Sequence, residues 1–150
     1  MMAPRSAKWL LRGICLSVVL AAGPAAAASE PRPELAIKGY DTVAYFKLGK
    51  AMRGSESFTL RWRDRIWQFS SREHRGLFAA EPERYAPQYD GYCAWAMTES
   101  RLAITDPEVW KIVEGKLYLN CSQAAYEKWS RDIPGHIRKA DAIWKEKFGK

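Results

Sequence analysis

Residues 91–97 read Gly-Tyr-Cys-Ala-Trp-Ala-Met, and residues 106–120 read Asp-Pro-Glu-Val-Trp-Lys-Ile-Val-Glu-Gly-Lys-Leu-Tyr-Leu-Asn. The second segment decides the fold, because two runs rich in β-branched and aromatic residues, 109–113 and 116–120, surround a Glu-Gly pair. A pair of this kind is typical of a two-residue turn between antiparallel strands. The sequence therefore predicts a β-hairpin over residues 109–120.

A helix is expected directly after this hairpin. Ser122 is a residue type that caps helix N-termini, and the helix is predicted to run to about Arg131. Cys121 lies at this junction of strand and helix, where unpaired backbone N–H groups favour a thiolate over a thiol. Cys93 and Cys121 are the only cysteines beyond the N-terminal segment, so we expect any sulfur chemistry to involve them.

The first half of the chain repeats this plan. Strand-like runs at 58–62 and 66–69 predict another hairpin, and a capping-box pattern that begins at Ser70 predicts a helix over 71–80. With an offset of 51 positions, this hairpin and helix fall on those of the second half. The duplicated hairpin–helix unit predicts an α+β fold of small antiparallel sheets with packed helices.

Residues 39–150 are expected to form one domain. The preceding residues 29–38 contain two prolines and no periodicity, and we interpret them as a flexible lead-in. At the other end, Asp132 and Pro134 open a last helix. Its apolar stripe is expected to cover the core and consists of Ile133, Ile137, Ala140, Trp144 and Phe148.

Residues 1–28 have the three parts of a secretory signal peptide. They begin with basic residues, continue with an apolar run at 13–22, and end in small residues, with cleavage expected near Ala27 or Ala28. The apolar run is much shorter than the ~20 residues that span a bilayer, so no stable membrane anchor is expected. The sequence predicts export to a bacterial periplasm.

The charge balance does not favour nucleic acid as a partner. The 150 residues carry 24 Lys and Arg against 17 Asp and Glu, a formal net charge of +7. Without Arg5, Lys8 and Arg12 of the signal segment, 21 cations face the same 17 acids, or +4. These charges are mixed along the chain, and neither a basic stripe nor a known nucleic-acid-binding module is present.

Two sulfur side chains are expected on one face of a strand. If residues 92–97 form a strand, Cys93 and Met97 point to the same side. A thiolate and a thioether together suit Cu(I). The alternative is that both side chains simply pack in the core, where free Cys and Met are common.

His74 is a further candidate ligand, since imidazole binds several transition metals. In the duplication it corresponds to Ala125, four residues after Cys121, so it approaches a common site if the two units face each other. The alternative is an exposed or loosely hydrogen-bonded histidine in the first turn of a helix. His136 has no partner at metal-ligand spacing and is expected at the surface.

The sequence contains no motif of a common hydrolase or nucleotide-binding enzyme. Gly-x-Ser-x-Gly, His-Glu-x-x-His and a glycine-rich phosphate loop do not occur. Carboxylates are scattered, so spacing alone supports no acid–base pair. An enzyme is therefore not the expected class. A thiol redox centre at Cys93 stays open as a third interpretation, and it predicts fast alkylation at neutral pH.

Four motifs together resemble exported bacterial YHS-domain proteins. They are Gly-Tyr-Asp-x-Val-Ala-Tyr-Phe at 39–46, Tyr-Ala-Pro-Gln-Tyr-x-Gly-Tyr-Cys-Ala at 85–94, Gly-Lys-Leu-Tyr-Leu-Asn at 115–120 and Asp-Ile-Pro-Gly at 132–135. The resemblance covers residues 36–146. It implies a treble-clef-like metal-binding fold, in which one cysteine lies in an early strand and two more, spaced Cys-x-x-x-Cys, open a helix. Such domains occur beside heavy-metal transporters and sensors.

By this resemblance, Cys93 matches the early cysteine and Cys121 the first helix-opening one. Ala125 stands where the last cysteine is implied, so a site of three thiolates cannot form. Members of the exported subfamily usually have Tyr at the position of Cys121. The resemblance therefore implies the fold and, in part, a metal site.

The leading hypothesis is a periplasmic protein that binds or handles a soft metal, with copper first and zinc second. Cys93 and Cys121 would bind the ion, and Met97 or His74 would complete the site. A metal transporter or another periplasmic protein would be its partner. The alternative is a non-catalytic structural or interaction module, in which a Cys93–Cys121 disulfide closes a loop of about 28 residues and contributes on the order of 3 kcal/mol.

Overall fold

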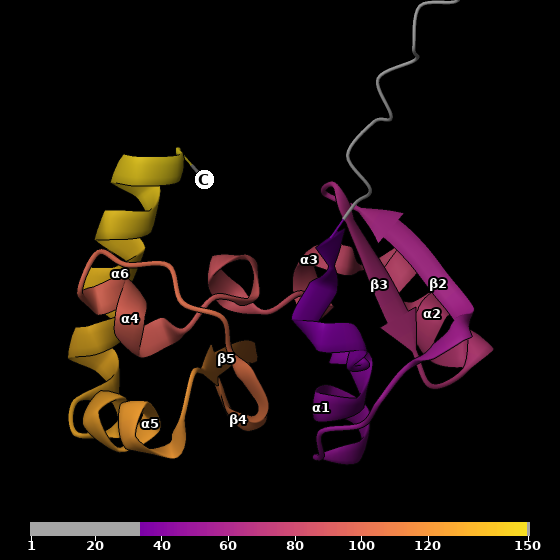
Figure 1. Ribbon diagram of the computed structural model, residues 1–150, viewed down its shortest axis with the longest axis horizontal. Coiled ribbons are helices and arrows are strands. Elements are labelled where there is room, and N and C mark those ends of the chain that lie inside the picture. Colours follow the sequence, from indigo (N-terminus) through magenta and orange to yellow (C-terminus); the bar gives the residue numbers. More distant parts are fainter. Residues whose placement is uncertain (1–33, 150) are drawn as a thin grey trace, which may run out of the picture. The chain divides into compact units, whose positions relative to one another are not determined.

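The computed structural model describes residues 34–149 (Figure 1). The expected signal peptide and residues 29–33 of the expected lead-in lie outside this range. Within it, none of the helices has the length and apolar character needed to cross a membrane.

The described residues form an α+β structure with six α-helices, two 3-10 turns and two small sheets. In chain order the elements are β1 (Glu34–Leu35), η1 (Ala36–Gly39), α1 (Thr42–Leu48), β2 (Ser55–Trp62), β3 (Arg65–Phe69), α2 (Arg72–Ala80), α3 (Pro82–Tyr85), η2 (Gln88–Gly91), α4 (Ala94–Thr98), β4 (Asp106–Val113), β5 (Lys116–Asn120), α5 (Gln123–Ser130) and α6 (Ile133–Phe148).

Both predicted hairpins are present. β2 pairs with β3, and β4 pairs with β5, each in antiparallel orientation. The first sheet is mixed rather than purely antiparallel, because the short strand β1 pairs with β3 in parallel, and this differs from the expectation. Each hairpin also has a register shift in its first strand, between Ser55 and Thr59 and between Asp106 and Trp110, which are equivalent positions in the duplication.

The duplication is longer than the sequence pattern indicated. A 3-10 turn and a short helix precede each hairpin, so the first repeat runs from η1 to α2 and the second from η2 to α5. The turns share an uncommon backbone path. φ is 37°, 53° and 78° at Ile37, Lys38 and Gly39, and 56°, 52° and 84° at Tyr89, Asp90 and Gly91. This match makes α1 and α4 equivalent helices.

The strand predicted over residues 92–97 is therefore wrong. Residues 94–98 form α4, and Cys93 is its N-cap residue, as Asp41 is the N-cap residue of α1. The error arose from the small, apolar composition of this segment, which suits a short buried helix as well as a strand. The shared Gly-Tyr pairs at 39–40 and 91–92 were the available signal for a helix.

The lead-in predicted over residues 29–38 is also too long. Residues 34–38 form β1 and most of η1, and Ala36 and Ile37 are buried in the core. Gly91 explains part of this burial, because a Cβ on that glycine would lie 2.9 Å from Cγ2 of Ile37. The domain therefore begins before residue 39.

The three predicted helices after the hairpins are confirmed as α2, α5 and α6. Ser122 and Asp132 cap α5 and α6 as expected, with side chains that accept from the N–H groups of Ala125 and Gly135. α2 differs in one detail, because its N-cap is Ser71 rather than Ser70. The side chain of Ser70 therefore does not cap α2, and its hydroxyl donates to Asp41 instead.

Two apolar clusters hold these elements together. One joins α1, β3 and α2 to the inner side of β5 and consists of Ala36, Ile37, Val43, Tyr45, Trp67, Phe69, Phe78, Tyr85, Ala86, Leu117 and Leu119. The other lies where α4 and α5 pack on α6 (Figure 1) and consists of Tyr89, Ala94, Met97, Tyr118, Trp129 and Ala140. The cysteines lie in a third, smaller cluster next to this second one.

Candidate functional site

Cys93 and Cys121 lie in contact with each other. The backbone N–H of Cys121 donates to Sγ of Cys93 at 3.1 Å, although the two residues are 28 positions apart. Both cysteines are free thiols, and Cys93, Ala96 and Ala125 form a small buried cluster against which Cys121 packs. Folding thus brings the two cysteines next to each other. We call Cys93 and Cys121 the dithiol site.

The two sulfurs differ in exposure. Cys93 is fully buried, whereas Cys121 is only partly buried and offers the approach from solvent. Burial raises the pKa of the Cys93 thiol from its usual value near 9 to about 11, and the N–H groups of Ala96 and Cys121 oppose this effect. Cys93 is therefore protonated at neutral pH unless something displaces its proton.

Cys93 owes its position to the helix it caps. Its Sγ accepts from the N–H of Ala96 at 3.5 Å, which satisfies one of the first N–H groups of α4. On the other side of the sulfur, Asn120 Oδ1 lies 3.8 Å away and accepts from the thiol. The same oxygen accepts from the N–H of Trp95 at 3.1 Å. Asn120 was not identified from the sequence.

The surroundings of the dithiol site include a cation. The pKa of Arg101 is raised, first by its hydrogen bond to Glu99 and to a smaller extent by the charges that Cys121 and Cys93 carry when ionised. Arg101 donates to Glu99 at 2.8 Å and is largely exposed.

The structure does not bring the other two predicted ligands to the dithiol site. Met97 is buried in the aromatic cluster with Tyr118 and Trp129. The strand face on which it was predicted does not exist, since residues 94–98 form a helix. His74 is in the first repeat, where its Nδ1 lies 2.6 Å from Asp41 Oδ2. His136, expected at the surface, is partly buried and binds the carbonyl oxygen of Trp129 at 2.7 Å.

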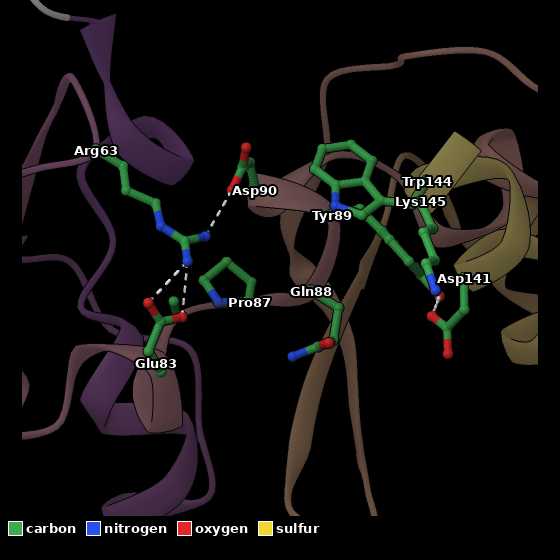
Figure 2. A pocket seen from close by; sticks show the side chains of 10 residues that line it. Arg63, Glu83, Pro87, Gln88, Tyr89, Asp90, Asp141, Trp144 and Lys145 are labelled. Atoms are coloured by element: carbon green, nitrogen blue, oxygen red, sulfur yellow. Dashed lines mark hydrogen bonds and ion pairs between the residues drawn. The ribbon is translucent and has the colours of Figure 1, made fainter. Parts of the chain in front are cut away.

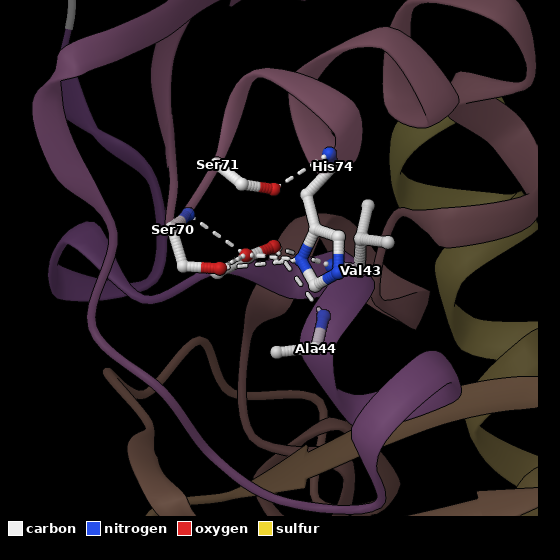
Figure 3. A network of polar contacts seen from close by, with 6 residues as sticks. Val43, Ala44, Ser70, Ser71 and His74 are labelled. Carbon is white, nitrogen blue, oxygen red and sulfur yellow. Dashed lines mark hydrogen bonds and ion pairs between the residues drawn. The ribbon is translucent and has the colours of Figure 1, made fainter.

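The first repeat holds a polar network at the equivalent place. Asp41 is fully buried, and its Oδ1 accepts from the N–H groups of Val43 and Ala44. Its Oδ2 accepts from the N–H and the hydroxyl of Ser70, at 2.8 and 2.5 Å, and contacts His74. Figure 3 shows the side chains of Ser70 and His74 directed toward the same point, where both contact Oδ2 of Asp41.

The two sites correspond residue by residue. Asp41 and Cys93 cap equivalent helices, and each accepts from the backbone N–H that follows a hairpin, that of Ser70 or that of Cys121. His74 corresponds to Ala125. A carboxylate with a full set of donors therefore occupies one repeat, and a sulfur with fewer donors occupies the other.

A separate pocket of about 350 Å³ lies between the hairpin turn of β2 and β3, η2 and α6. Figure 2 shows Trp144, Lys145 and Asp141 entering it from α6. Most of its charges are bound to one another, since Arg63 donates to Glu83 at 2.7 Å and to Asp90 at 3.3 Å. The remaining acid also has a protein partner, because the Tyr89 hydroxyl donates to Asp141 at 2.8 Å.

Among residues 34–149 no group of three or more His, Cys, Asp and Glu side chains is arranged to hold a metal ion. The dithiol site therefore offers two protein ligands, both sulfur, together with the neighbouring amide of Asn120. No family model matches this sequence, and no curated protein or solved structure is found to be similar to it.

Proposed function

We propose that this chain is a periplasmic protein that binds a soft metal ion at the dithiol site, with Cu(I) as the preferred ion and zinc as the second choice. The observation that carries the proposal is the contact between the backbone of Cys121 and Sγ of Cys93 at 3.1 Å, which makes two free thiols neighbours. Paired thiolates select soft cations, and a low coordination number suits Cu(I) better than tetrahedral zinc.

Several properties of the dithiol site support this role. The half-buried Cys121 gives an ion access to the fully buried Cys93, and the N–H groups of Ala96 and Cys121 can stabilise negative charge on the inner sulfur. The fully buried Asn120 also has a side-chain Nδ2 without a partner among the described residues, a polar group that a ligand-bound state can use.

The resemblance to exported YHS-domain proteins is the second support. It implies a treble-clef-like metal-binding fold with a cysteine where a helix opens, and Cys121 precedes Ser122, the N-cap residue of α5. We extend the proposal to the signal peptide over residues 1–28, to export to the periplasm, and to a metal transporter or another periplasmic protein as the partner that receives or delivers the ion.

The test is a titration of Cu(I) into the reduced protein in competition with a chromogenic chelator. We expect about one ion per chain for the wild type and for Met97→Leu, which removes a sulfur outside the dithiol site while keeping the packing. The variant C93S/C121S should take up none. Equal uptake by C93S/C121S and the wild type would rule the proposal out.

A second candidate function rests on the same proximity. Two neighbouring free thiols, one of them accessible, can be oxidised to a disulfide in an oxidising compartment, and the chain would then be a structural or interaction module. Mass spectrometry of the protein extracted without reductant separates the two. A species lighter by two hydrogens in every molecule favours the disulfide, and an unmodified pair of thiols favours metal binding.

A further inference from the structure

Asn120 is an unusual residue for its position. It is the last residue of β5 and is fully buried, and its equivalent at the end of β3 is Phe69, which is also fully buried. The first repeat thus has a phenyl ring where the second has an amide. A buried amide needs hydrogen-bond partners, so its presence requires a physical reason.

The carbonyl half of this amide has such a reason. In α1, a single oxygen of Asp41 accepts from two N–H groups, those of Val43 at 3.0 Å and Ala44 at 3.3 Å. In α4 the cysteine sulfur accepts only the second of the equivalent pair, from Ala96. The first, from Trp95, is accepted by Asn120 Oδ1 at 3.1 Å, so the amide replaces an acceptor that the cysteine does not supply.

The other half of the amide has no such reason among the contacts of the described residues. Asn120 Nδ2 is buried and has no hydrogen-bond partner among the described residues. The carbonyl oxygen, which lies 3.8 Å from Sγ of Cys93, stabilises that residue as a thiol because only the S–H can donate to it. Once the S–H proton is gone, an oxygen at this place faces sulfur lone pairs and is unfavourable.

We propose that Asn120 is a positioning residue of the dithiol site, whose amide rotates by half a turn when an ion binds. As a sulfur–metal bond forms at each cysteine, the S–H bonds of Cys93 and Cys121 break and both protons leave to solvent. Nδ2 then donates to the metal-bound sulfur, and the N–H of Trp95 turns to the same sulfur, as both N–H groups do at Asp41. This inference rests on the proposed function.

The rotation couples two states of the amide to two states of the sulfur. The rotation breaks two contacts of Oδ1, the long one with the S–H of Cys93 and the hydrogen bond from the N–H of Trp95. Hydrogen bonds to an anionic acceptor are shorter and stronger than those between neutral groups, so the new bonds from Nδ2 and Trp95 to the sulfur outweigh them. Groups that hydrogen-bond to metal ligands typically change metal affinity by about 10–100-fold. Asn120 should therefore raise the affinity of the dithiol site by a factor in this range.

The experiment combines a variant with a direct view of the amide. Asn120→Leu should bind the same number of Cu(I) ions as the wild type with an affinity about 10–100-fold weaker. Phe69→Leu, the equivalent change in the first repeat, should leave the affinity unaltered. In ¹⁵N-labelled wild-type protein, the side-chain NH₂ signals of Asn120 should shift on addition of Cu(I).

Each result has a definite meaning. If the wild type binds Cu(I) but the Asn120 NH₂ signals stay in place, or if N120L binds as tightly as the wild type, this inference is wrong while the proposed function stands. If the wild type takes up no more Cu(I) than C93S/C121S, the proposed function fails, and the inference with it. The NMR measurement on wild-type protein decides the question even if N120L does not fold.

Discussion

The network around Asp41 and the dithiol site occupy the same place in the two repeats, yet they differ in how completely the protein satisfies them. Asp41 accepts from Val43, Ala44 and Ser70 and contacts His74, so its two oxygens are fully engaged. Among residues 34–149, Sγ of Cys93 accepts from two backbone N–H groups. The comparison indicates that the protein itself satisfies the carboxylate of the first site more completely than the sulfur of the second.

The network around Asp41 should show the largest change in the free energy of unfolding on mutation. Asp41→Ala removes an acceptor from a fully buried network and should lower the free energy of unfolding by on the order of 3–5 kcal/mol. Cys93→Ala removes a weaker cap and should cost about 1–2 kcal/mol. Urea denaturation of both variants measures the difference. A larger loss for Cys93→Ala than for Asp41→Ala would reverse the assignment of the two sites.

His74 gives a smaller effect on the same network. His74→Ala breaks the contact with Asp41 Oδ2 at 2.6 Å and should cost roughly 1.5–3 kcal/mol of stability. It should not change the number of Cu(I) ions bound, because His74 belongs to the first repeat. Loss of Cu(I) uptake in this variant, with the fold intact by circular dichroism, would restore His74 as a ligand.

Transfer of this histidine to the second repeat tests whether positions 74 and 125 are equivalent. Ala125→His places an imidazole where His74 stands in the first repeat and should add a third ligand beside Cys93 and Cys121. Zinc gains most from an added ligand, so its affinity should rise by about tenfold, or ~1.4 kcal/mol. Ala124→His, on the exposed side of α5, is the control and should leave zinc affinity unchanged. Equal affinities for the two variants would show that the repeats are not equivalent at this position.

The smallest effect is on the pH dependence of stability. The pKa of Cys93 is raised by burial to about 11 in the folded protein, so its contribution to stability is complete below about pH 9 and is lost as the pH rises toward 11. The wild type should therefore lose more stability than Cys93→Ala over this interval. Urea unfolding at several pH values checks this, and parallel curves would contradict it.

The sequence was sufficient for the elements with a strong pattern. Both hairpins, the helices capped by Ser122 and Asp132, and the duplication were predicted, since turn residues and caps act locally. The proximity of Cys93 and Cys121 was predicted as well, because both cysteines match ligand positions in the resemblance to exported YHS-domain proteins.

Other features depended on long-range contacts. Residues 92–97 were assigned to a strand because their small or apolar side chains fit either structure, and only the equivalence of α4 with α1 distinguishes the two. The prediction that Cys93 and Met97 share one face of a strand depended on that error. Asp41 and Asn120 were missed because their partners lie 25 or more positions away, at Ser70 and Trp95. A polar residue at the end of an otherwise apolar strand, as at Asn120, was the one signal in the sequence.

X-ray absorption at the copper edge of the Cu(I)-loaded wild-type protein is the most direct test of metal binding at the dithiol site. We expect a low-coordinate ion whose nearest neighbours are two sulfur atoms, and the loss of this signature in C93S/C121S. A first coordination sphere made of nitrogen or oxygen atoms, or one that persists without the two cysteines, would contradict it.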